Sequence, residues 1–241
     1  MPEEQQHEVE EPAIVAAKLV EQFFPDARAA FLSGGVLSSR RTPTSDLDIV
    51  VVLDGPPAPY RETVRALGWV VELFVHSRDS LGRFYQIDAK ERRCTLASMC
   101  TGHVLKDTGG IAGEIQQEAA NIIAAGPSEL TSDERAQRRY FLTDLLDDLR
   151  GTSDPIEELF IGTYLVQTAG ILVLQNGRHW NGNGKWLARQ LAEVDGEFAA
   201  ALSQGLRTLT VNGDKQPLIE VVTAVLDAAG GPLTEGYTVG R

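Results

Sequence analysis

Residues 32–53 read LSGGVLSSRRTPTSDLDIVVVL, the most informative stretch of the chain for its architecture. The apolar run from Ile49 to Leu53 predicts a strand that is buried on both faces. Asp46 and Asp48 lie two positions apart at the head of this strand, so their side chains leave the same face. Two carboxylates there repel each other unless a cation lies between them. Mg²⁺ fits best, because it takes hard oxygen ligands and shares its coordination sphere with phosphates.

The loop before this strand has the composition of a phosphate-binding loop. Gly34 and Gly35 predict a tight turn whose backbone amides can approach phosphate oxygens closely. Ser33 and Ser45 add hydroxyl donors, and Arg40 adds positive charge. We take these five residues as candidates for binding a nucleoside triphosphate.

A third carboxylate lies in a second apolar run, WVVELFV, residues 69–75. Glu72 is the only polar residue of that run, and a buried acid needs a partner. The metal site would provide one; the structural alternative is an ion pair with Arg92 or Arg93. In phosphoryl transfer, metal ions align the triphosphate while a carboxylate accepts the proton of the attacking hydroxyl. The candidate metal ligands and catalytic residues are Asp46, Asp48 and Glu72.

The order of elements predicts two domains. Strands are expected over residues 29–32, 47–53, 69–75 and 102–106, with helices over 11–24 and, as a crossover, 60–67. From residue 111 onward the pattern is helical throughout, over 111–125, 131–149, 155–175, 184–193, 195–207 and 214–229. We therefore expect an α/β (α+β) domain with a small mixed sheet over residues 1–126, and an all-α helical bundle over residues 127–241.

Composition narrows the functional classes. The 241 residues carry a net charge of −12, which disfavours long nucleic acid as a partner and suits a small or cationic acceptor. No apolar run predicts a membrane span, and the N-terminus is acidic, so we expect a cytoplasmic protein with no membrane partner. Cys94 and Cys100 are expected to be half-buried thiols.

The pattern resembles the DNA-polymerase-beta-type nucleotidyltransferase superfamily. The shared features are the Gly34-Gly35 turn, a spacer of about a dozen residues, the Ser45–Ile49 segment with its Asp-x-Asp pair, and the later strand with Glu72. Bacterial antibiotic nucleotidyltransferases, such as the aminoglycoside adenylyltransferases, are similar in pattern and also carry a helical bundle after the catalytic domain.

This resemblance implies a role for each matching residue. Gly34 and Gly35 would hold the triphosphate, Asp46 and Asp48 the metal ions, and Glu72 would be the third carboxylate. In the helical half, residues 177–189 (GRHWNGNGKWLAR) resemble a Gly-Lys-Trp segment of such bundles. Lys185 in that segment is the candidate for reaching the triphosphate across an interdomain cleft.

The implied activity is transfer of a nucleoside monophosphate, AMP from ATP, to a hydroxyl of a small molecule such as an aminoglycoside-like antibiotic. The expected cofactor is Mg²⁺, with two ions, and ATP is the donor substrate. Two alternatives stay open: an antitoxin-type enzyme that nucleotidylates a protein, and a nucleotide-binding regulatory protein without catalysis. The identity of the acceptor is not determined, and a homodimer is compatible with the sequence.

Overall fold

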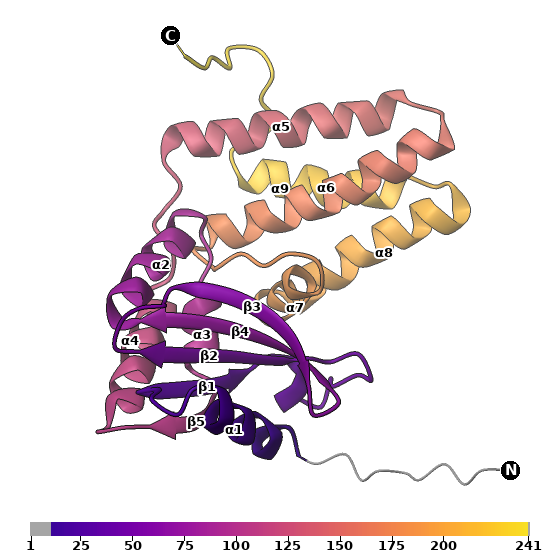
Figure 1. The fold of residues 1–241 in the computed structure, drawn as a ribbon. Coiled ribbons are helices and arrows are strands. Elements are labelled where there is room, and N and C mark those ends of the chain that lie inside the picture. Colours follow the sequence, from indigo (N-terminus) through magenta and orange to yellow (C-terminus); the bar gives the residue numbers. More distant parts are fainter. Residues whose placement is uncertain (1–10, 241) are drawn as a thin grey trace, which may run out of the picture. The chain divides into compact units, whose positions relative to one another are not determined.

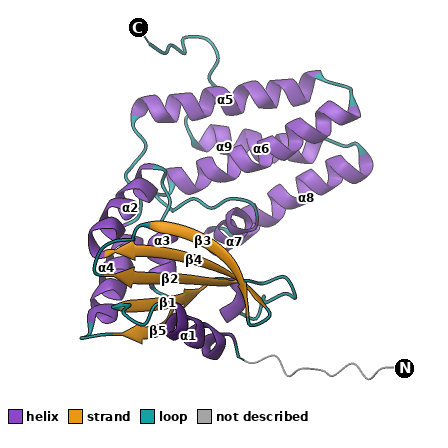
Figure 2. Ribbon diagram, viewed as in Figure 1, coloured by secondary structure: helices purple, strands orange, loops and turns teal. Residues whose placement is uncertain are grey.

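A computed structural model describes residues 11–240 of the chain. The chain divides into two compact units, one ending at Ala125 and the other starting at Gly126. A five-stranded mixed sheet with helices belongs to the first unit, and the described part of the second is helical (Figures 1 and 2). This confirms the expected fold class, a small mixed sheet with helices followed by a helical bundle.

The first unit contains the following elements. Its strands are β1 (Ala29–Ser33), β2 (Leu47–Leu53), β3 (Tyr60–Ala66), β4 (Trp69–Ser77) and β5 (His103–Asp107). Its helices are α1 (Pro12–Phe23), the short 3₁₀ helix η1 (Gly35–Leu37), α2 (Arg78–Lys90), α3 (Thr95–Cys100) and α4 (Ile111–Ala125). The four strands expected from apolar runs are thus confirmed, whereas α2 and α3 were not expected.

The sheet has the strand order β3-β4-β2-β1-β5. The central pair, β2 and β4, is parallel, and every other neighbouring pair is antiparallel. The two central strands are the two strongest apolar runs of the sequence, which fits their burial on both faces. Consequently the start of β2, with its Asp-x-Asp pair, lies beside the start of β4.

The crossover helix expected over residues 60–67 is wrong, because this segment is β3, an edge strand paired with β4. Leu67 and Gly68 join the two strands, and both have positive φ, 49° and 81°. Two consecutive residues with positive φ form the hairpin turn that matches the twist of paired strands. Thr63 and Val64 are β-branched, which also favours a strand.

Helices cover the two faces of the sheet unequally. α1 packs on one face, and α2, α3 and α4 pack on the other (Figure 1). On the second face, Val50 and Val52 of β2 are fully buried, whereas Asp48, two residues earlier on the same face, is only half-buried. The three helices therefore leave the start of β2 open on the face that carries Asp48.

The second unit is built from helices that share a leucine-rich core. They are α5 (Ser132–Gly151), α6 (Pro155–Asn176), α7 (Lys185–Val194), α8 (Gly196–Asn212) and α9 (Gln216–Ala228). α6 corrects one expectation, since by length and composition alone it is apolar enough to cross a membrane. A single such helix is weak evidence for a span; Leu165, Ala169 and Leu172 lie in the core of the unit, and 28% of the apolar window is buried.

Candidate metal centre

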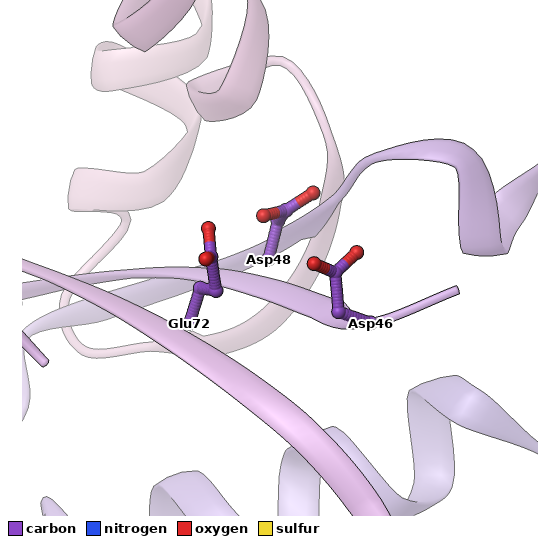
Figure 3. A group of neighbouring side chains, drawn as sticks. All are labelled: Asp46, Asp48 and Glu72. Carbon is purple, nitrogen blue, oxygen red and sulfur yellow. The ribbon is translucent and has the colours of Figure 1, made fainter. Parts of the chain in front are cut away.

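Three carboxylates meet at the open end of the central strands. Asp46 directly precedes β2, and Asp48 of β2 is the register partner of Glu72 on the parallel strand β4. One oxygen from each of the three lies within 4.8 Å of the others, and all three residues are half-buried. Figure 3 shows the three carboxylates pointing to the same side. Hard oxygen ligands at this spacing are the donor set that a divalent cation such as Mg²⁺ takes, so these residues fit a metal.

Glu72 also has a cationic partner, which is neither Arg92 nor Arg93. Nη2 of Arg61 donates a hydrogen bond of 2.6 Å to Oε2 of Glu72. Arg61 lies on β3, the strand that was expected to be a helix, and its side chain is 60% exposed. The Glu72 side chain is 23% exposed, so solvent screens the pair mainly at its arginine end, and we expect it to contribute about 1 kcal/mol to stability. Arg61 can therefore leave Glu72 at small cost when a metal ion competes for the carboxylate.

The glycine turn lies against the carboxylates. A Cβ on Gly34 would overlap with Oδ2 of Asp48, and Gly34 has a φ of +89°. Both the close approach and the positive φ require glycine at this position. The backbone amides of Gly34 and Gly35 make no hydrogen bond to any other residue in the described range 11–240. They are therefore available to an anion beside the carboxylates.

Gly35 differs from Gly34 in two respects that make it a control. A Cβ on Gly35 meets nothing within 4 Å, and its φ is not positive. We expect Gly34→Ala to weaken Mg²⁺-dependent ATP binding by roughly tenfold or more, because the added methyl displaces the Asp48 carboxylate and the backbone is strained by about 1–3 kcal/mol. Gly35→Ala should bind ATP like the wild type. Calorimetry on both variants checks this, and equal losses would show that the turn acts only through its flexibility.

The other candidate nucleotide-binding residues of the loop differ in their surroundings. Ser33 ends β1 and is the register partner of Asp48, so it adjoins the carboxylates. Ser45 is engaged within the loop, where its Oγ accepts a hydrogen bond of 2.9 Å from the amide of Thr42. Arg40 is exposed, and its backbone amide donates to Oγ of Ser38. Their contact with a nucleotide stays a prediction.

Lys185 is the first residue of α7 in the second unit and is exposed. Its Nζ lies 5.9 Å from the ring centroid of Trp186, a cation–π distance. The carboxylates and the glycine turn belong to the first unit. The expected approach of Lys185 to the triphosphate remains a proposal.

Two residues on β3 and β4 did not stand out in the sequence, Arg61 beside Glu72 and His76 farther along β4. Arg61 was not considered because its segment was assigned to a helix; the hairpin turn at Leu67-Gly68 was the signal that could have revealed it. His76 looked like an ordinary strand-end residue. In the structure it is 6% exposed, on the same face of β4 as Glu72. Burial lowers the pKa of His76 to about 4, so its imidazole is neutral at physiological pH.

Comparison with known proteins gives distant structural likeness only to solved structures, one of which is described below. No protein-family model matches the chain. No match to a curated protein was found either. A solved structure described as a nucleotidyltransferase-like protein from Exiguobacterium sibiricum aligns with a TM-score of 0.42 and 12% sequence identity, over 90% of this chain and 73% of that one. At this level the likeness carries no inference about function, which has to come from the side chains of the chain itself.

Proposed function

We propose that the chain is a metal-dependent nucleotidyltransferase. One observation carries the proposal: the carboxylate oxygens of Asp46, Asp48 and Glu72 lie within 4.8 Å of one another. The turn residue Gly34 supports it, since only a residue without a side chain fits beside Asp48 there. A carboxylate cluster next to free backbone amides can hold a cation and a polyphosphate together, whereas either feature alone is common in proteins.

The roles of the residues follow from their positions. Asp46 and Asp48 would hold Mg²⁺, two ions when the triphosphate is present, and Glu72 would complete the ligand set. The bound metal supplies neutralisation of phosphate charge and alignment of the α-phosphorus. The amides of Gly34 and Gly35 would donate hydrogen bonds to phosphate oxygens. Arg61, displaced from Glu72, keeps its positive charge near the developing negative charge.

The reaction balances with the groups present. The oxygen of an acceptor hydroxyl forms a bond to the α-phosphorus of the nucleoside triphosphate, and the bond from that phosphorus to the β-bridging oxygen breaks. Pyrophosphate leaves with the electron pair of the broken bond. Glu72 is the proposed acceptor of the hydroxyl proton, because a general base must lie within hydrogen-bond reach of the attacking hydroxyl and a carboxylate can accept its proton.

The donor and acceptor are proposed as ATP and a small hydroxylated molecule, for which the net charge of −12 favours a neutral or cationic compound over a nucleic acid. Lys185 is proposed to bind a phosphate oxygen as a point charge. A cytoplasmic location is proposed with this activity, because ATP and Mg²⁺ are available there.

A labelling screen tests the proposed function. Purified protein is incubated with Mg²⁺ and each of the four nucleoside triphosphates labelled at the α-phosphorus, together with a panel of aminoglycosides, other hydroxylated small molecules and proteins of a cell extract. We expect label on one acceptor class and an equal amount of pyrophosphate. Nucleotide binding without label transfer to any acceptor class would favour the regulatory alternative, and label on protein alone would favour the antitoxin-type enzyme.

A further inference from the structure

A cavity of about 300 Å³ lies in the first unit, and none of the three carboxylates of the candidate metal centre lines it. It is lined among others by Arg61, Phe74, His76, Phe84, Leu96 and Met99. This volume is at the lower end of the range for small-molecule sites in proteins. Nothing in the proposed chemistry of the carboxylates requires a cavity here.

The position of the cavity follows from the period of β4. Glu72, Phe74 and His76 alternate onto one face of the strand. At a rise of about 3.3 Å per residue, Phe74 lies roughly 7 Å and His76 roughly 13 Å along the strand from Glu72. Arg61 joins the two places, since its guanidinium contacts Glu72 at 2.6 Å and lies 4.7 Å from the ring centroid of Phe74. A molecule with one end in the cavity can therefore present its other end to the carboxylates.

The walls of the cavity suit a flat ring. Phe74 and Phe84 are only partly buried, so they leave apolar ring surface facing the open volume. Leu96 and Met99 add aliphatic surface. Aromatic side chains bind planar rings by offset or edge-to-face stacking. A polyhydroxylated chain would leave its hydroxyls without partners against such walls.

His76 supplies a directional polar group in this apolar surrounding. Its Nδ1 is paired with Oγ of Ser80 at 3.2 Å, and its ring packs edge-on against Phe84 with centroids 5.0 Å apart. Nε2 makes no hydrogen bond to another residue of the described chain, although His76 is 6% exposed. This nitrogen is not among the fully buried polar atoms that lack a partner in the described residues, so it keeps accessible surface that a ligand or water can reach.

The charges of the lining exclude a polycationic guest. Asp88 is the one carboxylate among the described residues that line the cavity, and its Oδ2 already accepts a hydrogen bond of 2.9 Å from the amide of Leu96. Arg61 is cationic and is directed at Glu72. An amino sugar with several ammonium groups needs several free carboxylates, which this cavity does not offer.

We propose that this cavity binds an uncharged planar nitrogen heteroaromatic ring, which stacks on Phe84 and Phe74 and exchanges a hydrogen bond with Nε2 of His76. The proposal rests on the proposed function and adds a substrate class to it. Two sources share this chemistry, the base of the nucleoside triphosphate and a ring of the acceptor.

The decisive variant is Thr95→Trp. Thr95 is exposed, begins α3 and lines the cavity, so an indole there fills the opening without entering the core. Ser98→Trp is the matched control, because Ser98 is exposed on the same helix and does not line the cavity. Phe84→Leu is a second variant, which keeps apolar volume and removes the ring. Unfolding temperatures of all three, compared with the wild type, show that each is folded.

Three probes are compared on each variant: ATP and inorganic tripolyphosphate, both with Mg²⁺, and the free heterocycles adenine and quinoline detected by saturation-transfer NMR. If the cavity takes the base, Thr95→Trp weakens ATP binding roughly tenfold or more, as loss of base stacking does, and leaves tripolyphosphate binding unchanged. If it takes an acceptor ring, both polyphosphates bind as before and the signal of a free heterocycle is lost in Thr95→Trp and Phe84→Leu only.

The proposal is overturned when Thr95→Trp and Phe84→Leu change neither ATP binding nor heterocycle binding relative to Ser98→Trp. This result differs from failure of the proposed function, for which the wild type itself would bind Mg²⁺-tripolyphosphate no better than tripolyphosphate in chelator. Binding of a free heterocycle does not depend on the carboxylates, so this measurement shows whether the cavity binds a ring even if the proposed function fails.

Discussion

Replacing Asp48 by Asn is expected to reduce nucleotidyl transfer by about 10²- to 10³-fold or more while the fold stays intact. Asp48 lies between Asp46 and Glu72, with an oxygen within 4.8 Å of an oxygen of each. An amide there removes one negative charge from the metal site and places a hydrogen-bond donor against a cation. Because Asp48 is half-buried at the start of its strand, the substitution leaves the core of the sheet unchanged.

Asp54→Asn is the matched control for this variant. Asp54 follows the other end of β2, where it forms an ion pair of 3.1 Å with Arg28. It should keep wild-type turnover. Steady-state rates with saturating ATP and Mg²⁺ compare the two variants. More than about a tenth of wild-type turnover in Asp48→Asn, a loss of less than about 1.4 kcal/mol, would contradict the assignment of Asp48 to the metal site.

Glu72→Gln should bind ATP and lose turnover by roughly 10²- to 10⁴-fold, the range that a general base contributes. The side chains are nearly isosteric, but a neutral amide cannot accept the proton of the acceptor hydroxyl. The competing explanation is that Glu72 serves only to pair with Arg61. Its arginine end is 60% exposed and its carboxylate end 23% exposed, so loss of the pair alone should change stability by about 1 kcal/mol.

Arg61→Met separates these two explanations, because it breaks the ion pair and keeps the carboxylate. Glu62→Gln, at an exposed position next to Arg61 on β3, is the control for the loss of one negative charge outside the site. Turnover and unfolding temperature are measured for the three variants. If Glu72→Gln and Arg61→Met lose stability equally and the folded fraction of each turns over normally, Glu72 has a structural role only.

The sequence was sufficient to predict the central strands and the juxtaposition of the carboxylates. Long apolar runs predict buried strands from hydrophobicity alone, and the period of two places Asp46 and Asp48 on one face. Glu72 was informative because an acid inside such a run needs a partner. The burial of a strand and the face on which its side chains lie both follow from the sequence of that strand alone.

The strand β3 and the ion-pair partner of Glu72 could not be predicted in the same way, because they depend on strand pairing and on a turn. β3 is an edge strand with charged side chains, and its hydrophobic pattern does not distinguish a strand from a helix. Its identity follows from the turn at Leu67-Gly68, and the partner of Glu72 follows from its register with β4. Arg92, which the sequence offered as that partner, is instead buried at a φ of 56° after α2.

α2 was missed for a related reason. Its start is fixed by a capping box, in which Ser77 and Ser80 exchange hydrogen bonds between side chain and backbone. Serine at the third helical position is a weaker signal than the usual Glu or Gln. The cavity was beyond prediction, because its walls come from β3, β4, α2 and α3, two of which were not expected at all.

The dependence of ATP affinity on divalent metal is the most direct measure of whether these carboxylates form a metal-dependent nucleotide site. Asp46, Asp48 and Glu72 form a negative site that should repel a polyphosphate unless a cation lies between them. Isothermal titration of ATP into the wild type should give a dissociation constant at least about tenfold lower in Mg²⁺ than in chelator, a difference of about 1.4 kcal/mol. Asp48→Asn should reduce that difference to near zero. Equal ATP affinity of the wild type in Mg²⁺ and in chelator would contradict a metal-dependent nucleotide site at these carboxylates.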